Sequence, residues 1–453
     1  MGKSVTKILI ATYVPTLNKG ELELLAGILK TFNVLGETEV DIFSFYPELD
    51  VKRYPSSIRL INIRKDLHLD RFLRNGSYSS LLLGSLFAGI QHLFFVFSYA
   101  FFGENVLDFM KSSIWREYCS SDALVVCVDE DDCVIGTTFM EFSPVYLSLL
   151  AKRLRKPIVV YANSTTRTGN VVVVWRLQSR WLWRIMAKHF LDNVDLITVR
   201  NEDTLDYYRS LTRKEARLHL TCDPGVLLDP VDPKTVQRIM AKEKIDKNGR
   251  LLIGATVTRR LLMHAFTEYS SEHERYERSV CEIAKVLDRL TTKYESHIIF
   301  LPHCIEYYRN NDDRVVGHDI VEKMKNKSSA KVITNEYSPQ ELKGLIGQFD
   351  VFVGDRIHAL VSALSMNVPC CTLAYRSDRR PYSIIGKDFK QEKWIFEVDT
   401  FDADALYELL IDLISSREEI SRNLPSITQL TEEKALLNGR LLRTLLHSAP
   451  VNA

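Results

Sequence analysis

The sequence predicts an α/β protein with two doubly wound, Rossmann-like domains. Short runs rich in β-branched residues alternate with longer segments of helical character, which is typical of parallel sheets with crossover helices. A chain of 453 residues is too long for one ordinary core, so two domains are expected. A turn rich in proline and aspartate at 222–233 separates two series of strands.

The strand signals of the first half precede that turn, and those of the second half follow it. We therefore predict an N-terminal domain over 1–228 and a C-terminal domain over 229–453, the latter ending in helices. In the first domain we expect strands at 7–12, 40–45, 58–63, 123–128, 158–162 and 196–200.

The second domain repeats the same pattern. We expect strands at 251–257, 297–302, 331–334, 349–354 and 369–373, and helices at 275–294, 338–346 and 358–367. Ser338 followed by Glu341 has the spacing of a capping box. Two such domains with the active site in the cleft between them define a GT-B-like architecture. The alternative, one long Rossmann-type enzyme with an appended domain, lacks the G-x-G-x-x-G turn after the first strand.

Composition restricts the partners and the compartment. The chain has 59 basic and 58 acidic residues, a net charge of +1, so no global field attracts nucleic acid. Its eight cysteines form neither a CxxC pair nor a zinc-ligand spacing, which favours a reducing, cytoplasmic location. The apolar run near the N-terminus is too short for a signal peptide and is predicted to be the first strand.

Residues 80–103 contain no Asp, Glu, Lys or Arg, and they are numerous enough to span a bilayer. Three interpretations are open: a buried or cleft-lining hairpin of helices, a peripheral membrane-contacting element, or a span. A span would place strands of one sheet on opposite sides of the membrane. Arg71, Arg74 and Lys111 flank the segment and suit an anionic lipid surface, at the inner face of the membrane.

The segment 349–375 carries the clearest chemical signal. An apolar strand ends at Gly354, and Asp355, Arg356 and His358 follow on the turn that opens a helix. Ligands of open α/β sheets bind at the carboxyl ends of strands, and helix N-termini favour anions. An arginine and a histidine at such a turn predict a site that binds phosphate or carboxylate and supplies a proton.

The pattern G-x-R-x-H-A-L at 354–360, followed by a V-P strand that ends in Tyr375, resembles the C-terminal signature of polysaccharide pyruvyl transferases. Three other segments resemble the same family in the expected order. They are the TLNKGELELLAGIL loop and helix at 16–29, the ITVRNEDT strand end at 197–204 and the CDP turn at 222–224. The resemblance implies transfer of the pyruvyl unit of phosphoenolpyruvate onto two hydroxyls of a sugar, with no metal and no cofactor.

The resemblance also implies residue roles. His358 is the expected general acid, and Arg356 with Arg200 is the expected clamp for the anionic donor. The other candidates are Asn18, Gly20 and Glu21 for the acceptor, and Arg259, Arg260 and Arg379 for the donor. Each role has a structural alternative. The His358 ring could be hydrogen-bonded only to backbone, Arg356 could form an ion pair with Asp355, and Arg200 could pair with the acidic residues that follow it. His303 follows a strand and could line the cleft, but a lone loop histidine is more often only solvated, and we expect the latter.

The expected partners are phosphoenolpyruvate and a glycan or lipid-linked sugar acceptor of cell-envelope polysaccharide biosynthesis. One departure is Asp129–Asp132, where many members carry three glycines. These carboxylates would repel an anionic donor, or they could bind a divalent cation. Two rival functions therefore stay open: a GT-B glycosyltransferase that uses a nucleotide sugar, and a non-catalytic glycan-binding member.

Overall fold

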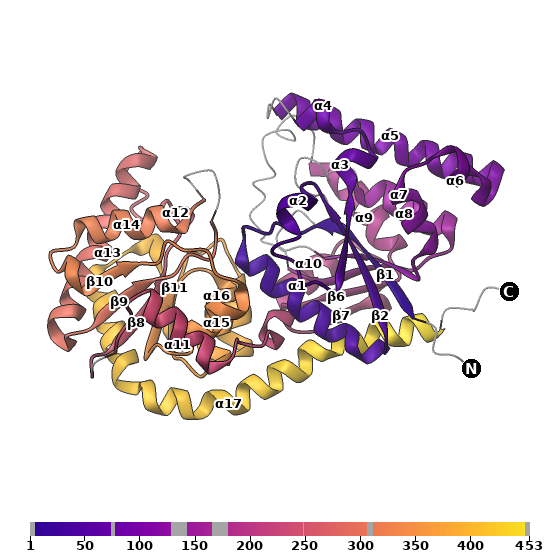
Figure 1. Cartoon of the computed structure of the whole chain (residues 1–453). Helices are drawn as coiled ribbons and strands as arrows, with labels where there is room; N and C mark the ends of the chain where they lie inside the picture. The colour runs from indigo at the N-terminus through magenta and orange to yellow at the C-terminus, as the bar shows by residue number, and fades with distance from the viewer. Residues whose placement is uncertain are drawn as a thin grey trace. The chain divides into compact units, whose positions relative to one another are not determined.

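The computed structural model describes residues 5–73, 78–127, 143–164, 180–247, 249–305 and 311–448. These residues form two compact units, each built on its own parallel sheet (Figure 1). Unit 1 comprises 1–16, 28–222 and 434–453, and unit 2 comprises 17–27 and 223–433. Each unit therefore includes a segment that is distant in sequence from most of that unit. Residues 17–27 come early in the chain but belong to unit 2, and the C-terminal residues belong to unit 1.

Unit 1 contains a seven-stranded sheet in the order β3-β2-β1-β4-β5-β6-β7, with every pair parallel. Its strands are β1 (Thr6–Tyr13), β2 (Thr38–Ser44), β3 (Ile58–Asn62), β4 (Ala123–Val126), β5 (Ile158–Asn163), β6 (Leu196–Val199) and β7 (Leu218–Leu220). The six strands predicted in this half are confirmed. The sequence does not predict the short edge strand β7, because it contains no β-branched residue.

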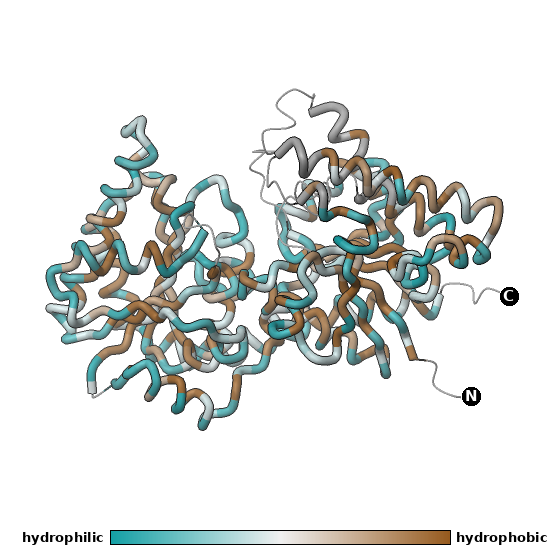
Figure 2. The backbone as a smooth tube through the Cα atoms, turned by 45° about the horizontal axis from the view of Figure 1, so that its top comes forward, coloured by the Kyte–Doolittle hydropathy of each residue, from teal (hydrophilic) through white to brown (hydrophobic). Residues whose placement is uncertain are grey.

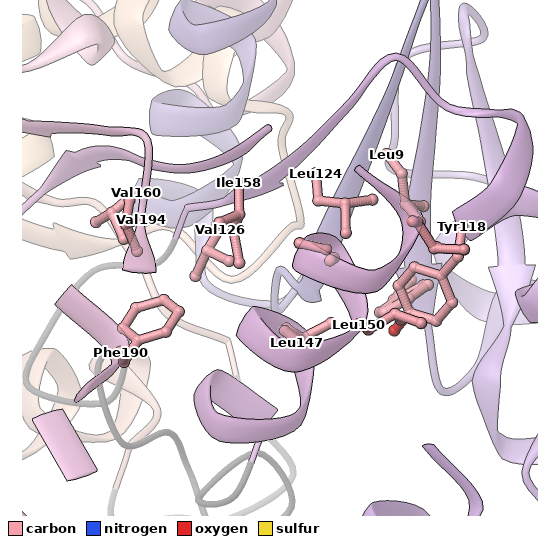
Figure 3. Close-up of a cluster of buried hydrophobic side chains, with 14 of the residues drawn as sticks. Leu9, Tyr118, Leu124, Val126, Leu147, Leu150, Ile158, Val160, Phe190 and Val194 are labelled. Atoms are coloured by element: carbon pink, nitrogen blue, oxygen red, sulfur yellow. The ribbon is translucent and has the colours of Figure 1, made fainter. Parts of the chain in front are cut away.

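The core of unit 1 fills the space between this sheet and its helices. Figure 3 shows Leu124 and Val126 of β4 and Ile158 and Val160 of β5 in one apolar cluster with Leu147 and Leu150, which lie on α8 (Ser143–Leu154). β4, which is buried on both faces, contains only apolar residues, as expected of a parallel sheet covered by helices.

The other helices of unit 1 are α2 (Pro47–Asp50), α3 (Ile63–Asp66), α4 (Asp70–Leu73), α5 (Tyr78–Phe102), α6 (Val106–Phe109), α7 (Ser113–Ser120), α9 (Arg180–Asn193) and α10 (Glu202–Arg209). The uncharged segment 80–103 lies almost entirely in α5, a single helix of 25 residues. The expectation of a hairpin of helices is therefore wrong. No residue between the two ends of α5 takes the left-handed backbone conformation that would turn the chain.

Unit 2 contains a six-stranded parallel sheet in the order β10-β9-β8-β11-β12-β13. Its strands are β8 (Leu252–Thr256), β9 (His297–Phe300), β10 (Ala330–Val332), β11 (Val351–Gly354), β12 (Cys370–Ala374) and β13 (Ile395–Glu397). All five predicted strands are present, and β13 is an addition. Figure 2 shows hydrophobic residues concentrated in the strands of both units.

The helices of unit 2 are α11 (Pro233–Lys242), α12 (Arg259–Leu262), α13 (Glu272–Tyr294), α14 (Asp313–Lys323), α15 (Pro339–Ile346) and α16 (Ile357–Ser365). The predicted capping box of α15 is confirmed, since Ser338 and Glu341 bond each other's backbone N–H groups. Two helices are shared by the units, α1 (Lys19–Phe32) and α17 (Ala403–Ser448). The C-terminal segment is thus one helix rather than the several expected, even though Pro425 lies inside it.

Candidate functional site

The site begins at the point in the sheet of unit 2 where the strand order reverses, between β8 and β11. The loops after these strands are joined by Asp355, whose carboxylate accepts hydrogen bonds from the backbone N–H of Thr258 at 3.0 Å and from its hydroxyl at 2.5 Å. Burial raises the pKa of the Asp355 carboxyl to about 6, although the neighbouring Arg356 lowers it. Crevices at such reversal points are the usual ligand sites of open α/β sheets.

Arg356 pairs with Asp313 rather than with Asp355. Its Nε and Nη2 atoms donate to the two carboxylate oxygens of Asp313 at 3.2 and 2.7 Å. The same carboxylate accepts the backbone N–H groups of His303 and Cys304, which fixes its position. Although burial opposes the charge, Asp313 raises the pKa of the guanidinium above its usual range. Arg356 is therefore a fixed cation that presents its Nη1 edge away from Asp313.

His358 is buried at the start of α16, where three chain segments meet around its ring. Nε2 lies 3.6 Å from a carboxylate oxygen of Asp223. A β-carbon at Gly20 would lie 2.6 Å from Nδ1, and one at Gly225 would lie 3.2 Å from Cδ2. A side chain at position 20 would therefore have to displace the ring, whereas one at position 225 would be tight against it. The carboxylate of Asp223 lies close enough to restrict the orientation of the ring.

Glu23 lies beside this pair and is buried. Its carboxyl accepts a hydrogen bond from the hydroxyl of Ser362 at 2.8 Å, and its Cγ lies near the Gly225 backbone. Burial raises the pKa of Glu23 to about 8, and Asp223 raises it further, while Lys343 and Ser362 lower it. The site therefore contains a carboxyl group whose burial favours its protonated form, next to one histidine and one carboxylate.

His303 is a second buried histidine of the cluster. Its backbone carbonyl accepts the N–H of Lys19 at 2.7 Å. Burial lowers the pKa of its imidazole to about 3, and the cations Arg356, His358 and Lys19 lower it as well. Its Nδ1 has no hydrogen-bond partner within the part of the chain that the structure describes. The expectation of a solvated loop histidine is wrong, because the ring is 2% exposed.

The three predicted acceptor residues lie at the start of α1. Asn18 accepts the N–H of Gly20 through its side chain and pairs with Cys304 through its backbone. Gly20 contacts the His358 ring, and Glu21 is buried. The sequence assigned these residues to the first domain, whereas they belong to unit 2. The loop after β1 and the loop after β11 therefore lie in one compact unit.

The other predicted arginines are distributed over several places. Arg200 is in unit 1, where it is buried and its N–H donates to the carbonyl of Asn163. The remaining three lie in unit 2, each over a tyrosine ring within cation–π range: Arg259 over Tyr276 at 4.1 Å, Arg260 over Tyr375 at 5.7 Å and Arg379 over Tyr382 at 4.7 Å. The cation–π contact positions each guanidinium at its tyrosine ring.

Metal binding receives no support from the described residues. Within them, no group of three or more His, Cys, Asp or Glu side chains has a geometry that would hold a metal ion. The acidic run Asp129–Asp132 lies outside the described residues. The described cysteines are free thiols.

Sequence reasoning did not assign a role to Glu23, Asp223, Asp313 or Lys343. Glu23 follows Gly20 by three residues on one helix, a spacing that places both on the same face. Asp223 lies in the CDP turn that carried the resemblance, so a signal was present. Asp313 and Lys343 gave no local signal, because aspartate at the start of a helix and lysine within one are common in helices of every kind.

The fold and this cluster define the chain as a GT-B-like protein with two Rossmann-like domains. A family model described as polysaccharide pyruvyl transferase matches residues 18–377. The chain therefore belongs to the polysaccharide pyruvyl transferase family. The match includes both the Asn18–Gly20 loop and the Arg356–His358 turn. No curated protein matches the chain.

Solved structures with a similar fold include UDP-N-acetylglucosamine 2-epimerases and HepE of Anabaena. A UDP-N-acetylglucosamine 2-epimerase shares 13% identity with a TM-score of 0.57, covering 98% of this chain and 96% of that one. The putative UDP-N-acetylglucosamine 2-epimerase of Listeria monocytogenes shares 11% identity at a TM-score of 0.56, covering 96% and 94%. HepE of Anabaena in complex with UDP shares 8% sequence identity at a TM-score of 0.56, and the match covers 98% of this chain and 100% of that one. At these identities the similarity shows the fold alone.

Proposed function

We propose that the protein transfers the pyruvyl group of phosphoenolpyruvate to two hydroxyls of a sugar and releases inorganic phosphate. The observation that carries the proposal is the His358–Asp223 pair, enclosed by Gly20 and Gly225, with the fixed cation Arg356 two residues before His358. The family supports a pyruvyl donor, and the geometry supplies an acid and an anion site beside each other.

The reaction divides into three balanced steps. Protonated His358 gives its proton to C3 of phosphoenolpyruvate, and positive charge develops at C2. One sugar hydroxyl adds to C2 and returns a proton to His358, after which the bond between C2 and the phosphate oxygen breaks and the phosphate leaves. The second hydroxyl then adds to C2 and gives its proton to the released phosphate, which closes the ketal, so the products are a pyruvylated sugar and hydrogen phosphate.

Arg356 is assigned to the donor anion. Asp313 uses the Nε–Nη2 edge of its guanidinium, which leaves the Nη1 group for a phosphate or carboxylate oxygen. Lys19, which is paired with Glu336, is a further cation of this cluster. Arg200, Arg259, Arg260 and Arg379 stay proposals as donor contacts, and Asn18, Gly20 and Glu21 as acceptor contacts.

The acceptor we propose is a glycan or a lipid-linked sugar used in cell-envelope polysaccharide synthesis, at the cytoplasmic face of the membrane. A lipid-linked acceptor would be consistent with the apolar helix α5. The sugar and its linkage await an acceptor screen with phosphate release as the readout.

Calorimetric titration of phosphoenolpyruvate into the wild type, Arg356→Ala and His358→Ala tests the proposal. We expect the wild type to bind, His358→Ala to bind without turnover, and Arg356→Ala to lose binding. Arg278→Ala, an exposed arginine paired with Glu282 in the same unit, is the matched control and should bind as wild type does. Binding of UDP-glucose and not of phosphoenolpyruvate would instead favour a nucleotide-sugar glycosyltransferase. Binding of neither, but of glycan alone, would favour a non-catalytic member.

A further inference from the structure

Helix α5 presents an apolar face to solvent that no described residue covers. We define the α5 outer face as Leu86, Ile90, Phe94, Phe97 and Phe101, which recur every three or four residues and so form one stripe. Their exposed fractions run from 42% at Leu86 to 72% at Phe101. Soluble proteins rarely expose a continuous apolar stripe of this length unless it binds something.

The opposite face of α5 is anchored in the core of unit 1. Ala88, His92 and Phe95 are buried, and the ring of Phe95 stacks on Trp115 of α7 at 4.6 Å. Figure 1 shows α7 and α8 on the inner side of α5. The stretch Leu86–Phe109 is long and apolar enough for a membrane span by length and composition. Its inner face, however, packs on a protein core, so a span would require this core to break.

Two polar side chains of α5, Gln91 and His92, are hydrogen-bonded within the protein, as contact with lipid favours. Gln91 donates to the carbonyl of Leu67 at 2.9 Å, and the two ring nitrogens of His92 pair with the carbonyl of Ala88 and the hydroxyl of Tyr118. The helix contains no Asp, Glu, Lys or Arg. A face between two protein copies would instead be expected to carry polar groups around an apolar centre.

The charges beside α5 complement an anionic surface. Arg116 on α7 and Lys152 and Arg153 on α8 are exposed, and the acidic residue within these two helices, Glu117, is buried. Arg153 donates to the carbonyl of Ala100, so its guanidinium lies at the Phe97–Phe101 end of the face. Glu104 and Asp108 follow beyond the end of the helix and are also exposed, so the basic residues Arg116, Lys152 and Arg153 outnumber the exposed acidic ones by one.

We propose that α5 is an in-plane membrane anchor, whose outer face inserts into the interfacial region of an anionic lipid bilayer while its inner face stays packed on α7 and α8. The anchor does not depend on the reaction that the protein catalyses. Apolar burial holds such a helix in the interface, and neighbouring arginines and lysines add attraction to anionic headgroups.

Flotation of the full chain with phosphatidylcholine vesicles, with and without phosphatidylglycerol, tests the anchor. We expect the wild type to float with the anionic vesicles. Phe97→Glu/Phe101→Glu should weaken vesicle partitioning by about tenfold for each phenylalanine. The control Val51→Glu/Leu430→Glu changes two apolar residues of similar exposure, 62% and 55%, outside α5 and should float as wild type does. Thermal unfolding of both variants should match the wild type.

A second measurement reports the depth of insertion. A tryptophan introduced as Phe97→Trp should be quenched by lipids brominated in their acyl chains, and Val51→Trp should not. Failure of the wild type to float, or flotation unaffected by Phe97→Glu/Phe101→Glu, would overturn the anchor. So would a wild-type dimer that this variant converts to monomer in the absence of vesicle binding, because the occupant would then be a second copy. Phosphoenolpyruvate binding in solution is independent of every one of these outcomes.

Discussion

Nδ1 of His358 faces Gly20 so closely that a β-carbon at that position would lie 2.6 Å from it. The two residues come from opposite ends of the family match, and both lie in unit 2. A glycine in the first turn of α1 thus makes room for a histidine that follows β11. This contact brings the N-terminal and C-terminal motifs together.

The first prediction concerns this contact. Gly20→Ala should displace the His358 ring, lower kcat by about a hundredfold and cost about 1–3 kcal/mol of stability. The measurements are steady-state kinetics of phosphate release and thermal unfolding. Gly386→Ala is the control, because its β-carbon would first meet the flexible side chain of Glu392 at 3.3 Å. Full activity in Gly20→Ala would contradict the assigned role of His358.

Removing one partner of the Arg356–Asp313 pair should be costly. Arg356→Gln is expected to destabilise the protein by about 3 kcal/mol, because it leaves a buried carboxylate with only two backbone N–H donors. Arg356→Gln/Asp313→Asn should be less destabilised than the sum of the single variants. Denaturant unfolding of all four proteins measures the coupling, and strictly additive losses would show that the two side chains do not depend on each other.

Asp223→Asn should alter the pH dependence of turnover rather than donor affinity. The carboxylate lies 3.6 Å from Nε2 of His358, and we expect it to stabilise the imidazolium that the reaction needs. Without it, His358 should lose its proton at lower pH, so the fall of kcat toward high pH should begin earlier. A pH–rate profile checks the shift, and calorimetry should find phosphoenolpyruvate binding unchanged. An unshifted profile would exclude the imidazolium as the acid.

Glu23→Gln should remove a pH dependence of stability. The folded-state pKa of Glu23 is raised from 4.5 to about 8, so the folded protein binds the extra proton between these values. Its contribution to stability is therefore complete below about pH 4.5 and declines by at most about 1.4 kcal/mol per pH unit as pH rises toward 8. A glutamine side chain at this position cannot ionise and can still accept the hydrogen bond from Ser362.

The comparison is made by thermal unfolding of wild type and Glu23→Gln at pH 6 and at pH 8. The difference in Tm should move in favour of the variant at the higher pH. Glu392→Gln, which changes an exposed carboxyl group of the same unit, is the control and should show no such change. Parallel pH profiles for wild type and Glu23→Gln would mean that Glu23 is ionised throughout.

Much of the fold could be predicted because its signals are local. Strands buried on both faces are continuous apolar runs, and the strand before Asp355 ends at a glycine, so the element types and the turn at Arg356 and His358 follow from the chain. The capping box at Ser338 is likewise a property of four neighbouring residues. The resemblance to the family could be found for the same reason, because the order of the motifs is a property of the sequence itself.

The tertiary structure alone decided which distant residues meet. Asp313, and not the adjacent Asp355, pairs with Arg356, because the backbone N–H groups of His303 and Cys304 in the loop after β9 hold the Asp313 carboxylate at the start of α14, where it meets that guanidinium. The protonated state of Glu23 depends on burial, which no spacing reveals. Which face of α5 is exposed also depends on the tertiary structure. The sequence of α5 is apolar all round, so only the packing of His92 and Phe95 on the core shows that the opposite face is exposed.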